Sequence, residues 1–294
     1  MPNCSKQHDI MANTLPQIRD RTKPKPLKRY QSLQTTLRAN RSFMRLLSLM
    51  LFFGIWQFLC VVGFKFFINF QLVPSPWEVL GATIEFFSSE PGVHLRSSIV
   101  RVLLGFAIAS ALGTVVGMLI GWFQVIEDLL MPPLELLRPI PAVAWIPLAI
   151  LIFPTAETGM IYITFVGAFF PVLISTIRAV ENILHDVVLI RVGQCLGASR
   201  WHIFKDIVIP GSLPGIASGL TIGMGNAWFC LVTAEILAGR YGVGYITWES
   251  YVTSNYPPIV MGMLLIGLMG ALSSWAVGRG MSALMPWRVI RKQN

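Results

Sequence analysis

The stretch VLLGFAIASALGTVVGMLIGW, residues 102–122, decides the fold class. It contains no charged residue, and it matches the roughly 20 apolar residues that an α-helix needs to cross the hydrocarbon core of a bilayer. The whole chain of 294 residues has the same character, with 54% hydrophobic and only 13% charged residues. Soluble domains carry about 25% charged residues. The sequence therefore predicts an all-α membrane protein.

Five more stretches are apolar enough to be membrane spans, which predicts six transmembrane helices in total. These five cover residues 46–64, 139–156, 158–177, 214–239 and 259–278. Only Glu157 separates the third span from the fourth, which indicates a tight hairpin there. The third span is the least regular, because its prolines must bend or shorten a helix; they are Pro139, Pro141, Pro147 and Pro154.

The basic residues are distributed unevenly along the chain. Most of the 23 Lys and Arg residues lie before the first span, after the second and fourth spans (Arg138 among them), and at the C-terminal end. The segments on the opposite side hold only Lys65, Arg96, Arg101 and Arg240. Positive residues concentrate on the cytoplasmic side of membrane proteins, so both termini are predicted to be cytoplasmic. Orientation also explains the net charge of +9 without a nucleic-acid partner.

These features divide the chain into three parts. Residues 1–42 are a basic cytoplasmic N-terminal tail, residues 43–280 are the transmembrane domain, and residues 281–294 are a basic cytoplasmic C-terminal tail. Residues 179–212 form a long polar loop of the transmembrane domain, which we expect on the cytoplasmic side.

Small residues recur at every fourth position in three of the spans. The series are Gly105, Ala109, Gly113, Gly117 and Gly121 in the second span, Gly215, Gly219 and Gly223 in the fifth, and Gly270, Ser274 and Gly278 in the sixth. This spacing places each series on one helix face, where backbones can approach closely. The stripes indicate either a subunit or gate interface or ordinary packing within one bundle, and the second interpretation is favoured.

The polar loop has its own pattern. Apolar residues at helical spacing precede Gly197, which is expected to break the helix. A short amphipathic turn follows, in which Trp201 and Phe204 are expected to be exposed. Pro210 and Pro214 are expected to end that turn and start the next span. An apolar face on a cytoplasmic loop needs a partner protein or the bilayer interface, so this turn is a candidate docking site or an interfacial anchor.

The second half of this loop resembles the signature loop of ABC-importer permeases, which has a Gly, nine further residues and then Ile-x-Leu-Pro. Gly197, Ile207 and Pro210 fall in register, with Ile209 at the Leu position. Arg191, Val192 and Gly193 replace the family's preceding Glu-Ala-Ala. The resemblance implies a helix that couples the spans to an ATPase, formed by Gly197, Ala198, Ser199, Arg200, Trp201, Phe204, Ile207 and Pro210.

Further motifs over residues 72–280 resemble the nitrate, sulfonate, taurine and bicarbonate branch of the binding-protein-dependent inner-membrane components. They are residues 72–76 (LVPSP), Arg101 with Gly105 and Phe106, residues 137–141 (LRPIP), residues 144–147 (AWIP), Ala234 with Glu235, and residues 242–244 (GVG). The resemblance implies a six-helix bundle of the type I ABC-importer kind in a bacterial inner membrane. It also implies an ABC ATPase subunit, a second permease copy in a homodimer, an extracytoplasmic solute-binding protein, and a small anion as the solute.

The chain shows no chemistry of its own. It lacks the Gly-x-x-x-x-Gly-Lys-Ser/Thr loop that holds nucleotide phosphates, so ATP would be bound by the partner subunit and this chain needs no cofactor. Neither its four Cys nor its four His residues have the spacing of a metal site or a catalytic centre. No enzyme activity is expected, and the alternative function is a secondary transporter or channel for a small solute.

Glu235 is the one carboxylate well inside a predicted span. Charges inside membranes are costly and often mark a pathway or a paired site. Glu235 is therefore a candidate for the translocation path or gate, or for a structural ion pair in which the nearby Arg240 would compensate its charge.

Overall fold

The computed structural model describes residues 28–63, 72–89 and 91–288, and this part of the chain is helical throughout apart from its connecting loops. The chain divides into two compact units, residues 1–58 and residues 59–294. The first predicted span lies in α2 (Lys28–Val62), where Phe43–Val62 is long and apolar enough to cross a membrane. Helix α2 begins inside the predicted tail of residues 1–42; residues 1–27 and 289–294 of the two predicted tails lie outside the described part.

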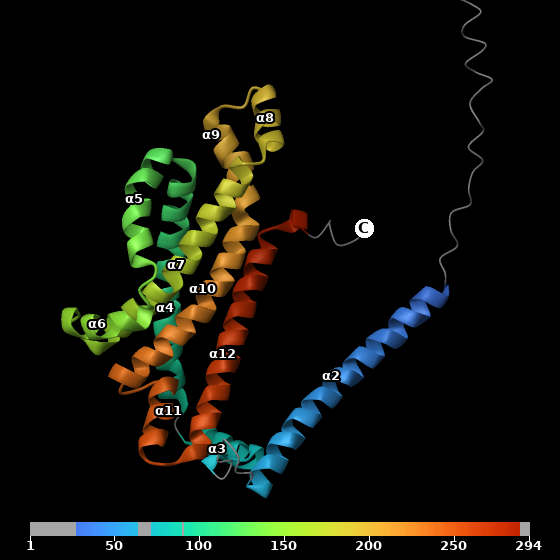
Figure 1. Ribbon diagram of the computed structural model, residues 1–294, viewed down its shortest axis with the longest axis vertical. Coiled ribbons are helices and arrows are strands. Elements are labelled where there is room, and N and C mark those ends of the chain that lie inside the picture. Colours follow the sequence, from blue (N-terminus) through green and yellow to red (C-terminus); the bar gives the residue numbers. More distant parts are fainter. Residues whose placement is uncertain (1–27, 64–71, 90, 289–294) are drawn as a thin grey trace, which may run out of the picture. The chain divides into compact units, whose positions relative to one another are not determined.

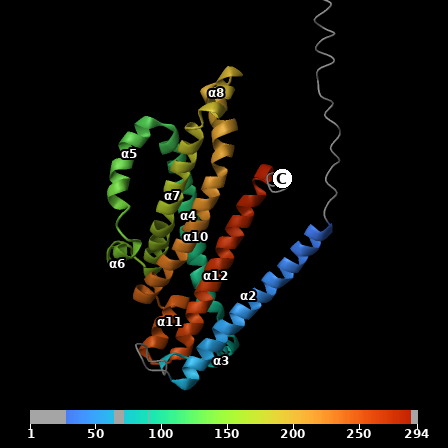
Figure 2. The same cartoon turned by 45° about the vertical axis from the view of Figure 1, so that its right-hand side comes forward.

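The second unit is a bundle of long helices with short elements at its ends (Figures 1 and 2). Its elements are α3 (Pro76–Ser88), α4 (Pro91–Trp122), α5 (Gln124–Leu137), η2 (Ala142–Trp145), α6 (Ile146–Ile152), α7 (Ala156–Leu184), α8 (Val187–Cys195), α9 (Arg200–His202), η3 (Ile203–Val208), α10 (Ile209–Ala238), α11 (Val243–Val252), α12 (Tyr256–Ala283) and η4 (Pro286–Arg288). Helices α8 and α9 lie at one end of the bundle, and α3 and α11 lie at the other (Figure 1).

Helix α7 is the centre of the bundle, and α4 packs on it through the predicted glycine stripe. A Cβ atom added to Gly117 would lie 2.8 Å from the Cβ of Thr176 and 3.0 Å from the carbonyl oxygen of Leu173. Gly105 and Gly121 meet Thr164 and Val180 of α7 in the same way. The stripe of the second span thus serves packing inside the chain, as the favoured interpretation predicted.

The stripe on α10 meets another side of α7. Gly215 and Gly219 lie against Ala179 and Ser175, and Gly223 lies against Val172. Helix α12 packs on α10 in turn, where the indole nitrogen of Trp228 donates a hydrogen bond of 2.8 Å to the hydroxyl of Ser273. Close contacts of small residues therefore join α4 to α7 and α7 to α10, whereas α12 is joined to α10 through Trp228.

The predicted third span is not a single helix. In the described part of the chain, five helices are long and apolar enough to span a membrane. A sixth crossing requires α5 together with residues 142–152, which are bent by 84° relative to each other. The prediction of a helix over residues 139–156 was wrong, because Pro139 and Pro141 interrupt the chain and the backbone at Pro141 is extended (ψ 136°). Helix α5 runs alongside α4 instead, with Ile126, Leu130 and Leu134 packed against the cluster around Ile120.

We predict that Gly117→Val destabilises the protein, because a branched side chain cannot fit between α4 and the backbone of α7. The expected loss is about 1–3 kcal/mol, the usual cost of overpacking. It would appear as a lower midpoint of thermal unfolding in detergent. Gly267→Val in α12 is the matched control, since an added Cβ there meets nothing within 4 Å. Equal midpoints for the two variants would contradict the packing described above.

Candidate functional site

The loop between α7 and α10 folds into a compact corner. Asp186 caps α8 by accepting a hydrogen bond from the amide of Leu189, and α8 ends at Cys195. Gly197 then adopts a left-handed conformation with φ of +77°. The amide of Ala198 donates to the carbonyl of Gly193 at 3.1 Å, and the amide of Gly197 donates to that of Gln194 at 2.9 Å. This is a Schellman cap, and it confirms the predicted helix break at Gly197.

The chain turns back into α10 without a break. The Ser199 hydroxyl caps α9 by accepting from the amide of His202. Residues 203–208 form a π-helix, in which the amide of Ile209 donates to the carbonyl of Phe204 five residues earlier. The expectation that Pro210 ends this turn was wrong, because residues 200–238 form one continuous helical segment. Pro210 has no amide hydrogen to donate, and the wider π-turn accommodates that loss.

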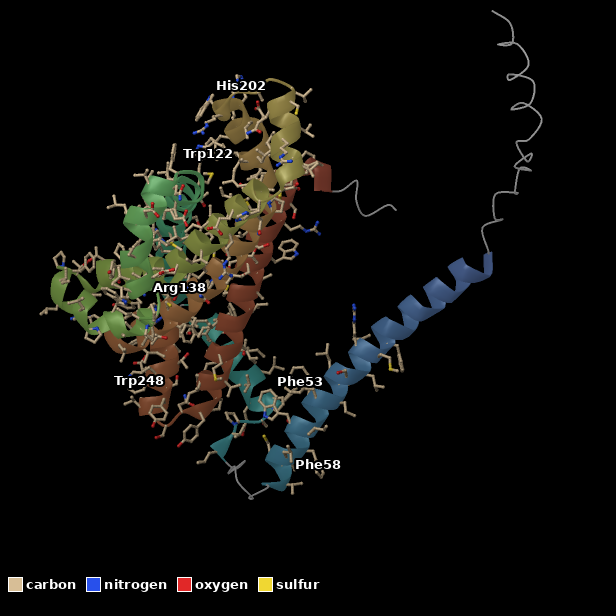
Figure 3. The ribbon with its side chains drawn as sticks, turned by 45° about the horizontal axis from the view of Figure 1, so that its top comes forward. Phe53, Phe58, Trp122, Arg138, His202 and Trp248 are labelled. Carbon is tan, nitrogen blue, oxygen red and sulfur yellow. The ribbon has the colours of Figure 1, made fainter. Side chains whose placement is uncertain are left out.

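The inner face of this corner is anchored on the bundle. Ile203 and Val208 are buried against Val180 of α7, and the ring of Phe204 lies 4.9 Å from that of Trp122 at the end of α4. Phe204 is therefore half-buried, whereas an exposed side chain was expected. Figure 3 shows Trp122 close to His202, near the tip of the bundle.

The outer face is left without a partner in the described part of the chain. Trp201 is 66% exposed and Leu196 is 82% exposed. Gly197, Ser199 and Arg200 are also exposed, and Ala198, Ile207 and Pro210 are half-buried. A cavity of about 490 Å³ adjoins Trp201 and Arg200, and Trp122 also lines it. We call the exposed surface formed by Leu196, Gly197, Ser199, Arg200 and Trp201 the corner surface.

A second polar cluster lies at the opposite end of the bundle, around Arg101 of α4. Its guanidinium is buried and donates to both carboxylate oxygens of Glu157, with an Nε–Oε2 distance of 2.7 Å. Its Nη1 donates to the carboxylate of Glu235 at 2.8 Å and to the carbonyl of Tyr241 at 2.7 Å. The cluster therefore joins α4 to the first turn of α7, the last turns of α10 and the loop before α11.

Glu235 is fully buried, and both of its carboxylate oxygens accept hydrogen bonds. One accepts from the Ser98 hydroxyl at 2.7 Å and from Arg101, and the other accepts from the amide of Gly244 at 2.9 Å. Gly242 has φ of +135°, and any side chain there would collide with the Glu235 carboxylate. These contacts favour the structural ion pair over an open path at Glu235.

The family model for the binding-protein-dependent transport system inner membrane component matches residues 109–279, which is more than half of the chain. The chain belongs to this family. It is the transmembrane permease subunit of an ABC importer, a transport component and not an enzyme. Permeases of this family are multi-pass inner-membrane proteins that work with an ATPase and a binding protein.

Several relatives of the permease are similar over most of their length. A putative ABC transporter permease protein of Methanocaldococcus jannaschii is 37% identical over 222 residues, 74% of this chain and 81% of that protein. The nitrate import permease protein NrtB of Synechocystis is 32% identical over 228 residues, with 74% and 80% covered. The taurine transport system permease protein TauC of Escherichia coli is 30% identical over 221 residues, with 73% and 80% covered. These relatives confirm the branch that the sequence motifs indicated.

Sequence reasoning missed the partner of Glu235 in the permease. Arg240 is exposed, and the buried partner is Arg101, which is 134 positions away in the sequence. A usable signal was present, because Arg101, Glu157 and Glu235 all lie at ends of predicted spans that face the same side. Leu196 and Trp122 were also missed as parts of the corner, although Leu196 directly precedes Gly197 of the family pattern.

We predict that Arg101→Gln destabilises the permease more than Glu235→Gln does. Loss of Arg101 leaves a buried carboxylate without its cation, which costs about 3–5 kcal/mol. Loss of the Glu235 charge leaves Arg101 paired with Glu157. Thermal unfolding in detergent would measure both, and the double variant should lose less stability than the sum of the two.

Arg240→Gln is the control for this series, because Arg240 is exposed and its loss should leave stability unchanged. Additive effects of Arg101→Gln and Glu235→Gln, or a loss at Arg240 as large as that at Arg101, would contradict the assignment of the pair.

Proposed function

We propose that the corner surface is the docking site of the ATPase subunit, and that docking there couples ATP hydrolysis to movement of the spans. The supporting observation is the geometry of residues 196–201, where Trp201 and Leu196 are exposed beside the cation of Arg200. Exposed aromatic and Arg side chains next to a recess are typical anchors of a protein interface. This surface lies at the end of the bundle where the signature-like segment begins.

The orientation and assembly follow from the same proposal. The ATPase is cytoplasmic, so the corner surface would face the cytoplasm. Helix α12 runs from the α11 end toward the α8 end in Figure 1, which brings the described C-terminal end to the corner's side. The basic residues before the first span and after the sixth support a cytoplasmic position for both termini. The permease would act as a homodimer with two ATPase copies.

The solute would be a small anion, such as nitrate, taurine or an alkyl sulfonate. The support is the function named for the relatives, a nitrate import permease at 32% identity and a taurine transport permease at 30% identity. Family membership favours this ATP-driven importer over a secondary transporter or channel. Glu235 then acts as a structural carboxylate at the outer end of the bundle.

We predict that Trp201→Ala lowers co-purification of the ATPase subunit by about 10-fold or more, as truncation of an aromatic anchor does at other interfaces. Trp248→Ala is the matched control, since Trp248 is a similarly exposed tryptophan on α11 at the opposite end (Figure 3). Gly197→Asp should have the larger effect, because it strains a left-handed position and adds a negative charge to the corner surface.

ATP-driven uptake is measured for the same variants. Gly197→Asp should abolish ATP-driven uptake while the spans remain inserted in the membrane, as protease accessibility would show. Normal uptake by Gly197→Asp, or equal ATPase co-purification for Trp201→Ala and Trp248→Ala, would refute docking at the corner surface.

We also predict ATP-dependent uptake of a small anion by the complete complex in proteoliposomes. The assay contains permease, ATPase and binding protein, with nitrate and taurine as separate substrates. Accumulation of either anion that stops when ATP is replaced by ADP supports the proposal. Accumulation that instead follows an imposed ion gradient without ATP would support the secondary transporter.

A further inference from the structure

A cavity of about 460 Å³ lies between the end of α5, η2, α7 and α10. Most of its wall is apolar, and it includes Phe170 and Phe229. Three polar side chains also face it, those of Arg138, Ser175 and Asn226. Its volume is in the range of pockets that hold small ligands. Among the described residues, Arg138 is the only cation that lines this mostly apolar cavity, and no residue of the corner surface or of the Arg101 cluster lines it.

The cavity lies at the middle of the membrane-spanning helices. Phe170 is the central residue of α7, about 21 Å from either end at a rise of 1.5 Å per residue. Asn226 lies near the middle of α10. Figure 3 shows Arg138 between Trp122, near the corner, and Trp248 at the other end. Since the hydrocarbon core is about 30 Å thick, the cavity falls within it.

Arg138 therefore does not lie in a cytoplasmic loop, where its position after the second span had suggested it would be. It follows the last residue of α5, and its amide donates to the carbonyl of Leu134 at 2.9 Å. The two prolines that follow, Pro139 and Pro141, prevent α5 from continuing. The Arg138 side chain is exposed in the single chain, on the side where it lines the cavity.

A cation at this depth requires a compensating partner. Arg at the centre of a membrane helix costs about 2.5–3.5 kcal/mol on insertion scales, and such residues almost always face a cavity or pair with another group. Within the described residues, no carboxylate forms an ion pair with Arg138, in contrast to the doubly paired Arg101. An anionic solute that occupies the cavity can therefore balance the positive charge of Arg138.

We propose that Arg138 contacts the transported anion at the midpoint of the translocation path. This inference rests on the proposed import of a small anion. The planar guanidinium can donate two parallel N–H groups to a nitrate or sulfonate group, a geometry that a lysine ammonium does not provide. The Asn226 amide and Ser175 hydroxyl add neutral donors, while the apolar wall limits competing water. A single cation holds a monovalent oxyanion only loosely, as transport requires.

The test uses the complete complex in proteoliposomes, with nitrate and taurine as probes. Arg138→Gln and Arg138→Met remove the charge at similar length, and Arg138→Lys retains it. We expect at least a 10-fold loss of uptake rate for Gln and Met and a smaller loss for Lys. The ATP hydrolysis stimulated by the binding protein should stay within about twofold of the wild type, because the corner surface is unchanged. Arg240→Gln, an exposed charge loss away from the cavity, should transport normally.

The outcomes separate the inference from the proposed function. If the wild type accumulates either anion and Arg138→Gln and Arg138→Met do so equally fast, the anion contact is refuted. If all three variants, Lys included, lose thermal stability and uptake together, Arg138 only stabilises the end of α5, which also overturns the inference. If the wild type accumulates neither anion, the proposed function fails and the inference fails with it.

Discussion

The close approach of backbones around α7 is the constraint on which the rest of the bundle depends. Lipid chains are as apolar as the helices, so the hydrophobic effect gives little drive for helix association inside a bilayer. Shape must supply the contact instead. Gly105, Gly117 and Gly121 allow α4 to touch α7, and Gly215 and Gly219 allow α10 to touch it from another side. Because α7 joins both neighbours, the corner surface and the Arg101 cluster have fixed positions at opposite ends of one core.

The long helices could be predicted from hydropathy because each is one continuous apolar run. The break at Gly197 could also be predicted, since a helix commonly ends with a left-handed glycine. The course of α5 was missed for a physical reason. Glu127, Asp128 and Glu135 interrupt its apolar character, so a search for charge-free runs passes over it. Its buried face is visible only as the helical spacing of Ile126, Leu130 and Leu134.

The charged residues at span ends were harder to place. The sequence indicates only roughly how deep in the membrane such a residue lies, and it does not indicate which residue forms an ion pair with it. Arg101 and Arg138 both border apolar runs, and the sequence therefore predicted that both lie in loops. In the structure Arg101 is buried with two carboxylates from distant helices, and Arg138 faces a cavity beside the middle of α7. The sequence around Arg138 differs from that around Arg101 mainly in the prolines that follow it. These prolines stop α5 before it reaches the far end of the bundle.

The helical segment that begins at Arg200 gives a physical basis for coupling between the two ends. It passes from the corner surface through the π-turn into α10 without a break, and Glu235 lies in the last turn of α10. The π-turn could absorb a displacement of Trp201 only by withdrawing Ile203 and Val208 from their contacts with Val180, which would expose apolar surface. If the proposed partner displaces Trp201, the displacement would therefore be carried along α10 more readily than it is absorbed. At the far end, the hydrogen bonds of Glu235 to Arg101 and Gly244 would pass it to α4 and α11.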